Sequence, residues 1–213
     1  MNLFKFEFPI DLASAIVGFL LAISLYVFDK LLEPNITIEV TDPSDLNLSQ
    51  GLFKVLNVKI SNKHYKGILK FKNRTLTQAR AVLTFKKYPT KVPLSDLENI
   101  RARWNATREP TTPDYKAVDF GSALVGSREV IVPGESTSIS ITIKKQGWEC
   151  CYPFNNESYL YQEKYDFKRP DWEIQDEEFY VTVTIQAAEM NKELGDFVVF
   201  NKGGLKNFKI SKI

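Results

Sequence analysis

The chain has 213 residues, of which 25% are charged and 44% are hydrophobic, and its formal net charge is +2. These values are typical of globular proteins and exclude a largely disordered chain. The length fits one domain with an attached segment, or at most two small domains. A net charge this small predicts no partner by itself.

Residues 1–33 are predicted to lie outside the globular fold, as a short tail and a transmembrane anchor helix. The segment LASAIVGFLLAISLYVF, residues 12–28, contains no charged residue and no proline. With the apolar residues at its margins it approaches the roughly 20 residues that cross a bilayer. The LEPNIT sequence that follows offers no small-x-small cleavage site. We therefore expect an uncleaved single-pass anchor, with the membrane as a partner.

The side of the membrane is predicted from the few charges near the helix. Lys5 precedes it, whereas Lys30 is the only cation in the next twenty residues, a small bias that places the C-terminal domain outside the cytoplasm. Five Asn-x-Ser/Thr sequons indicate the same side, because N-glycans are added on an exported surface. The candidate glycosylation sites are Asn35, Asn47, Asn73, Asn105 and Asn156.

Residues 34–213 are dominated by strand patterns. Clear alternation of apolar and polar residues occurs in NITIEVT (35–41), KVLNVKIS (54–61), QARAVLTFKKY (78–88), STSISITIK (136–144) and EEFYVTVTIQ (177–186). Shorter candidates are ILKFK (68–72), REVIV (128–132), DFVVF (196–200) and NFKISKI (207–213). Alternation buries one face of a strand and exposes the other, as in antiparallel sheets. The chain is therefore predicted to be all-β, an antiparallel β-sandwich with about seven to nine strands.

One segment near residues 95–104, PLSDLENIRARW, has a helical pattern instead. Ser95 and Glu98 have the spacing of a helix-capping box. An apolar stripe at i, i+3 and i+7 is formed by Leu97, Ile100 and Trp104. We expect a short helix that crosses an open edge of the sandwich.

The segment RARWNATREP, residues 101–110, has an unusual density of arginine around a tryptophan. Its candidate interaction residues are Arg101, Arg103, Trp104 and Arg108. One interpretation is structural: an arginine stacked on Trp104, with Glu109 forming an ion pair with Arg103 or Arg108, would stabilise a corner of the fold. The alternative is an anion site for lipid phosphate or acidic glycan. We favour the corner, and nucleic acid is not a favoured partner of an outward-facing domain.

The charges are distributed unevenly along the chain. Residues 54–108 contain 14 Lys and Arg against two acids, whereas residues 148–180 contain nine acids against three Lys and Arg. These halves either neutralise each other across neighbouring strands or leave a basic face for an anionic partner.

An aromatic-rich insertion is predicted near residues 146–176, before the strand that contains YVTVTI. Tyr and Trp are typical of protein-binding hot spots, and exposed rings also stack on sugars. We expect Tyr159, Tyr161 and Trp172 to form part of a recognition surface for a protein or glycan. The alternative is a second small core that packs the insertion onto the sandwich.

The chain offers little catalytic chemistry. His64 is the only histidine and lies in the basic sequence KHYK, without a GxSxG motif to accompany it. Cys150 and Cys151 are adjacent, so their number and spacing do not suit zinc. They are expected to be partly buried thiols, with a homodimer through a Cys150 or Cys151 disulfide as the alternative. No catalytic residue, cofactor or metal site is predicted.

Several segments carry a resemblance to known proteins. ARAVLTF, VPGESTSISITIK and YVTVTI resemble the strands of immunoglobulin-like modules in archaeal and bacterial surface proteins. With KVLNVKISN, RARWNATREP and FNNESYLY, the chain resembles an uncharacterised family of single-pass membrane-anchored prokaryotic proteins. The resemblance implies an immunoglobulin-like β-sandwich behind one N-terminal transmembrane helix, and implies no activity.

Together these patterns predict a non-enzymatic, membrane-anchored surface protein that presents a β-sandwich for protein or glycan interaction, or as an envelope-complex subunit. One alternative is a domain that faces the cytoplasm and binds anionic lipid or nucleic acid. A pilin-like subunit is another, although FKFEFPID lacks the basic-Gly processing site of such proteins. A hydrolase with a shallow site is the last.

Overall fold

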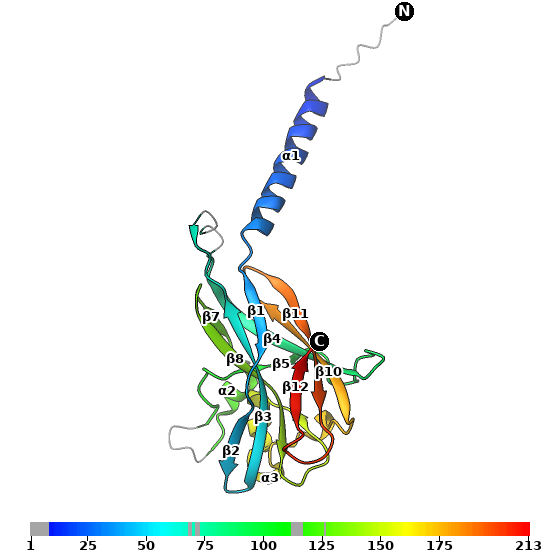
Figure 1. Cartoon of the computed structure of the whole chain (residues 1–213). Coiled ribbons are helices and arrows are strands. Elements are labelled where there is room, and N and C mark those ends of the chain that lie inside the picture. The colour runs from blue at the N-terminus through cyan, green and yellow to red at the C-terminus, as the bar shows by residue number, and fades with distance from the viewer. Residues whose placement is uncertain (1–8, 68–69, 71–72, 112–116, 126) are drawn as a thin grey trace, which may run out of the picture.

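The computed structural model describes residues 9–67, 70, 73–111, 117–125 and 127–213, without the side chains of residues 9–13 and 29–31. A long helix stands at one end of a body built mostly from strands (Figure 1). The strands form two sheets, and all of their pairings are antiparallel. The mainly β, sandwich-like architecture predicted from the alternating patterns is confirmed.

The first sheet has the strand order β1-β3-β8-β6, with β2 paired to β3 and β9 paired to β8. Its strands are β1 (Ile36–Val40), β2 (Ser44–Leu48), β3 (Gly51–Asn62), β6 (Arg103–Trp104), β8 (Ser136–Lys145) and β9 (Tyr152–Pro153). The second sheet has the order β12-β11-β10-β4-β5, with β7 paired to β4. Its strands are β4 (Leu76–Lys87), β5 (Ile100–Arg101), β7 (Glu129–Ile131), β10 (Glu178–Gln186), β11 (Asn191–Phe200) and β12 (Lys209–Lys212).

One hydrophobic core lies between the sheets and draws on both of them. The apolar faces predicted for 78–88, 136–144 and 177–186 are buried, because these strands are central in their sheets. Their core residues are Ala79, Ala81, Leu83, Phe85, Ile139, Ile141, Ile143, Phe179, Val181, Val183 and Ile185. The predicted strand 68–72 lies largely outside the described residues.

Strand β3 departs from simple alternation. Its register against β8 shifts between Leu56 and Asn57, where Ile141 of β8 has no partner in β3. Asn57 is buried at this bulge, as are its apolar neighbours. The Asn57 amide donates to the hydroxyl of Ser44 at 2.9 Å and accepts from the Asn105 amide at 3.2 Å. These bonds explain how a polar residue is accommodated at a buried position.

Helix α1 (Pro9–Leu31) has 23 residues and extends away from the sandwich (Figure 1). Pro9 suits the first helical position, because it has no N–H to leave unpaired. The chain leaves the helix at Leu32, whose side chain is buried, and Pro34 follows before β1 begins. Every side chain described on α1, over residues 14–28, is exposed. Within the residues that the structure describes, no helix is both long and apolar enough to cross a membrane.

The helix predicted near 95–104 is wrong. This segment forms a loop followed by β5 and β6, and Asp96 and Asn99 have φ angles of 65° and 58°. Such left-handed residues interrupt a helix. The loop instead hydrogen-bonds to β4, with Leu94 N donating to Phe85 O at 2.9 Å and Phe85 N donating to Leu97 O at 3.0 Å. The apolar stripe is nevertheless buried, because an extended chain brings Leu97 and the residues after it to the core.

The predicted insertion at 146–176 folds into short elements packed on the sandwich. These are β9, the 3-10 helix η2 (Asn156–Tyr161), α3 (Gln162–Tyr165) and the 3-10 helix η3 (Pro170–Trp172). A further short helix, α2 (Phe120–Leu124), packs against η2. Asn155 begins η2 with a capping box, in which its side chain accepts from Ser158 N at 3.1 Å.

Candidate functional site

The RARW part of RARWNATREP is a corner of the fold. Arg101 belongs to β5 in the second sheet, and Arg103 belongs to β6 in the first, so the chain changes sheets at Ala102. Trp104 is fully buried at this corner, and its indole Nε1 donates to the carbonyl of Ala79 at 3.1 Å. Strands that switch sheets commonly form the corners of β-sandwiches. Trp104 therefore serves the core and has no exposed ring face for a ligand.

The three arginines of this segment do not form one patch. Arg103 is 8% exposed, donates to Thr107 O at 2.9 Å and lies over the ring of Tyr159, 5.7 Å from its centroid. The predicted stacking partner was Trp104, and the structure supplies Tyr159 instead. Burial and the neighbouring Glu109 carboxylate raise the pKa of Tyr159, while Arg103 opposes that rise.

Arg101 and Arg108 are exposed, in different places, and each has carboxylates beside it. Arg101 shares a small pocket with Asp96, Glu157 and a second cation, Arg169, which pairs with Glu157. Arg108 lines another, of about 600 Å³, together with Glu109 and Asp119. Carboxylates at both places offset the positive charge that an anion would need. The structure thus gives no support to an anion site built from this cluster.

The aromatic insertion forms a second small core. Phe167 makes edge-to-face contacts with Phe53, Phe154 and Tyr159, at centroid distances of 5.6, 5.5 and 5.5 Å. These are favourable geometries for aromatic pairs. The contact with Phe53 joins the insertion directly to β3. This packing matches the alternative predicted for the insertion.

The three rings predicted to recognise a partner are placed differently from one another. Tyr159 and Trp172 are buried, at 4% and 5% exposure, so the prediction that they form a recognition surface is wrong. Trp172 lies under the guanidinium of Arg169, 4.1 Å away, and Arg169 pairs with Glu157 at 2.5 Å. Tyr161 alone remains partly exposed.

The five sequons differ in the freedom of their side chains. Asn156 is buried, and its amide donates to Ser122 O at 3.4 Å. The amides of Asn73 and Asn105 are held through both of their polar atoms, by the Tyr65 backbone and by Asn57 with Ser140. Asn47 is exposed on β2, and Asn35 is partly buried beside α1. Asn47 and Asn105 are both exposed, and of these two only Asn105 has its amide hydrogen-bonded at both polar atoms.

The two cysteines are free thiols in different environments. Cys151 is fully buried, and burial raises the pKa of its thiol. An intermolecular disulfide through Cys151 is incompatible with that position. Cys150 is partly exposed, and its sulfur lies 3.5 Å from the hydroxyl of Tyr152. A homodimer through Cys150 remains a prediction.

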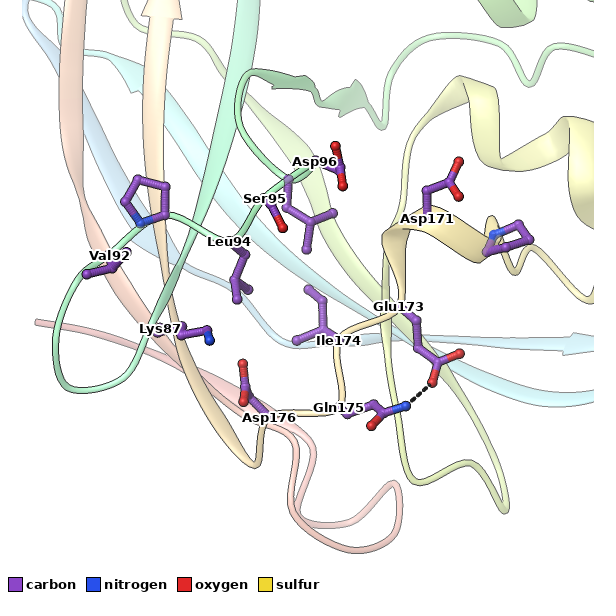
Figure 2. Close-up of a pocket in the computed structure, with 13 residues that line it drawn as sticks. Lys87, Val92, Leu94, Ser95, Asp96, Asp171, Glu173, Ile174, Gln175 and Asp176 are labelled. Atoms are coloured by element: carbon purple, nitrogen blue, oxygen red, sulfur yellow. Dashed lines mark hydrogen bonds between the residues drawn. The ribbon is translucent and has the colours of Figure 1, made fainter.

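A pocket of about 750 Å³ lies between the loop after β4 and the segment after η3 (Figure 2). Leu94 and Ile174 face each other at its centre, and Asp96 and Asp171 lie on opposite sides of its rim (Figure 2). It is open and mainly polar, unlike the enclosed apolar cavities that hold most small ligands.

Glu173 is the most constrained carboxylate in this pocket. Its Oε2 accepts from the hydroxyl of Tyr152 at 2.6 Å, and its Oε1 accepts from the amide of Gln175 at 2.6 Å. These bonds, that from Tyr152 first, hold the pKa of Glu173 below its usual value, whereas burial raises the pKa of Tyr152. A carboxylate that accepts on both oxygens and has a low pKa is a poor general acid or base. No group of three or more His, Cys, Asp or Glu in the described chain is placed to hold a metal ion.

A buried lysine fixes one wall of the pocket, and no sequence pattern pointed to it. Lys144 is fully buried, and its Nζ donates to Asn201 O at 2.6 Å, Asn201 Oδ1 at 3.0 Å and Gly203 O at 2.8 Å. Burial lowers its pKa. The Asn201 amide in turn donates to Ile174 O at 3.3 Å and Asp176 O at 3.2 Å. This network is a structural support behind the pocket.

Comparison with known proteins gives no relative: no family model, no curated protein and no solved structure matches the chain.

Proposed function

We propose that this protein is a non-enzymatic, single-pass membrane protein, in which α1 anchors a β-sandwich at the extracytoplasmic surface of the membrane. The sandwich would serve protein or glycan interaction, or act as a subunit of an envelope complex. Its immunoglobulin-like character is part of the proposal, supported by two antiparallel sheets and a strand that changes sheets.

The observation that carries the proposal is the exposed apolar surface of α1. Phe19, Leu25 and Phe28 are 66%, 68% and 60% exposed, and no described residue of the chain covers the apolar side chains of α1 over residues 14–28. Helices that are hydrophobic all round are normally buried, in a membrane or in a large protein. No helix is long and apolar enough to cross a membrane over the described residues, so the proposal depends on the whole of α1, including residues 9–13 and 29–31, whose side chains are not described. The 23 residues of α1 extend about 34 Å, against about 30 Å for the hydrocarbon core of a bilayer.

The separate core of the sandwich supports a division of labour between helix and domain. The buried hydrophobic cluster runs from Ile38 to Ile210 and contains none of the α1 side chains described, at residues 14–28. The sandwich is therefore stabilised by a core of its own, and α1 can lie in a lipid bilayer without removing residues from that core.

The outward side is supported by the charge bias around α1 and by the accessible sequon at Asn47. The buried amide of Asn156 and the bonded amides of Asn73 and Asn105 remove support that the sequence pattern had suggested. Protease treatment of intact cells tests the side directly. Digestion of the sandwich without lysis agrees with the proposal, and protection until lysis contradicts it.

Vesicle flotation of the full chain tests the anchor. The double variant Leu20→Arg/Leu21→Arg places two charges in the middle of α1, where each costs about 3 kcal/mol in a bilayer. Val130→Arg is the matched control, since Val130 is a 52% exposed apolar residue on the sandwich. With vesicles of phosphatidylcholine alone, wild type and V130R should float, and the double variant should remain at the bottom with unchanged thermal unfolding of the sandwich. A wild-type chain that stays at the bottom would contradict the anchor.

A further inference from the structure

The end of the sandwich that joins α1 carries three exposed lysines, Lys63, Lys66 and Lys70, here called the lysine surface. Lys63 N donates to the carbonyl of Asn35 at 2.8 Å, and Asn35 comes four residues after the last residue of α1. The segment after β3 and the base of α1 lie at the same end of the body (Figure 1). The lysine surface is therefore next to the point where the chain would enter a bilayer.

Hydrogen bonds fix both flanks of this segment relative to the sandwich. The Asn62 amide donates to Arg74 O at 2.7 Å and to Ile131 O at 2.9 Å. The Asn73 side chain accepts from Tyr65 N at 2.6 Å and donates to Tyr65 O at 2.8 Å. Because the flanks are tied to β7 and to each other, the position of the lysine surface beside α1 is built into the fold.

The charge of the lysine surface is not neutralised by neighbours along the chain. Residues 54–95 contain no Asp or Glu. None of the three lysines forms an ion pair with a carboxylate in the described part of the chain. Glu33 and Glu135 adjoin this end, Glu135 through its carbonyl, which accepts from Asn62 N at 3.0 Å. Glu189, whose carboxylate accepts from Thr77 and lies near Arg74, is a third carboxylate at this end. Lys63, Lys66, Lys70 and Arg74 together leave a positive excess over these three.

We propose that the lysine surface binds the anionic phospholipid headgroups of the bilayer that holds α1. This inference rests on the proposed membrane anchor. Lysines near an anionic leaflet are attracted by its negative surface potential, with a gain of about fivefold in binding per residue. The attraction decays within about 8 Å at physiological salt, so only lysines close to the anchor can use it. Two attachments, the helix and the lysine surface, would hold the sandwich at a fixed tilt. The β2–β3 hairpin lies at the end of the sandwich opposite α1 (Figure 1) and would therefore be remote from the bilayer.

Amine labelling of the full chain in vesicles tests the proposal. The protein is reconstituted into phosphatidylcholine alone or phosphatidylcholine with phosphatidylglycerol, and the labelling rate of each lysine is measured by mass spectrometry. Lys63, Lys66 and Lys70 should be labelled about fivefold more slowly in the anionic vesicles. Lys164, exposed on α3, is the internal control and should be labelled equally in both. Raising the salt concentration should remove the difference.

The outcomes separate this inference from the anchor. Equal labelling of the three lysines in both vesicles, with the protein floating in both, overturns the lysine surface alone. Flotation with anionic vesicles only, lost in K63Q/K66Q/K70Q, supports the lysine surface and contradicts the anchor. Flotation with neither vesicle type contradicts both.

Discussion

Substitution of Trp104 by phenylalanine separates a structural corner from a binding patch. Trp104 is fully buried, and its indole N–H satisfies the carbonyl of Ala79 at 3.1 Å. Loss of that donor leaves a buried carbonyl unpaired, at a cost of about 1–3 kcal/mol. The smaller ring leaves a cavity of about 40 Å³, which adds about 1 kcal/mol. The expected loss in the free energy of unfolding is therefore about 2–4 kcal/mol.

For a domain of this size that loss lowers Tm by about 5–15 °C. Urea and thermal unfolding followed by circular dichroism, on the full chain in detergent, measure both quantities. Arg101→Ala is the control from the same segment, because Arg101 is exposed and its loss should change stability by less than about 0.5 kcal/mol. A W104F variant as stable as wild type, or an R101A variant destabilised as much as W104F, would refute the structural role assigned to Trp104 at this corner.

Three further predictions concern the insertion and its surroundings. The pKa of Glu173 is lower in the folded protein than in the unfolded chain, where it is near 4.5, so its ionised carboxylate stabilises the fold above pH 4.5 and this stabilisation is lost as pH falls through the folded pKa. The difference in Tm between wild type and Tyr152→Phe should therefore shrink below pH 4.5, and a difference that stays constant would argue against the Tyr152–Glu173 hydrogen bond. A thiol reagent should modify Cys150 in the native protein and Cys151 only in denaturant, because Cys151 is buried; equal native rates would contradict that burial. Asn155→Ala should cost about 1 kcal/mol in urea unfolding through the lost cap, and an unchanged midpoint would show that the cap is dispensable.

The central strands could be predicted from the sequence because burial there follows the period of two. Ile139, Ile141 and Ile143 lie on a strand covered by the opposite sheet, so alternation was sufficient to assign their face. The register shift at Asn57 could not be predicted in this way, since the extra residue, Ile141 of β8, leaves the apolar alternation unchanged.

The helix near 95–104 and the exposed aromatic surface were predicted wrongly for related reasons. An i, i+3, i+7 pattern indicates which residues are buried but not the backbone conformation that buries them. A loop with left-handed residues at Asp96 and Asn99 places the same residues in the core. The high content of aromatic residues likewise indicates that the rings are packed against something, but not whether their partners lie within the chain or on another molecule. Tyr159 and Trp172 found their partners within the chain, through Phe167 and Arg169.

The support behind the pocket depends on contacts between distant segments. Lys144 reaches Asn201 and Gly203, more than fifty residues away along the chain. In the sequence it appears as an ordinary polar end of an alternating strand. Only the fold shows that its ammonium group is buried among carbonyl oxygens.

Alkaline carbonate extraction of membranes from cells that express the full chain tests the central claim most directly. If α1 lies in the bilayer and the sandwich outside it, the protein stays in the membrane pellet, while Leu20→Arg/Leu21→Arg moves it to the supernatant. Quantitative release of the wild-type chain by carbonate would contradict the anchor and, with it, the proposed function.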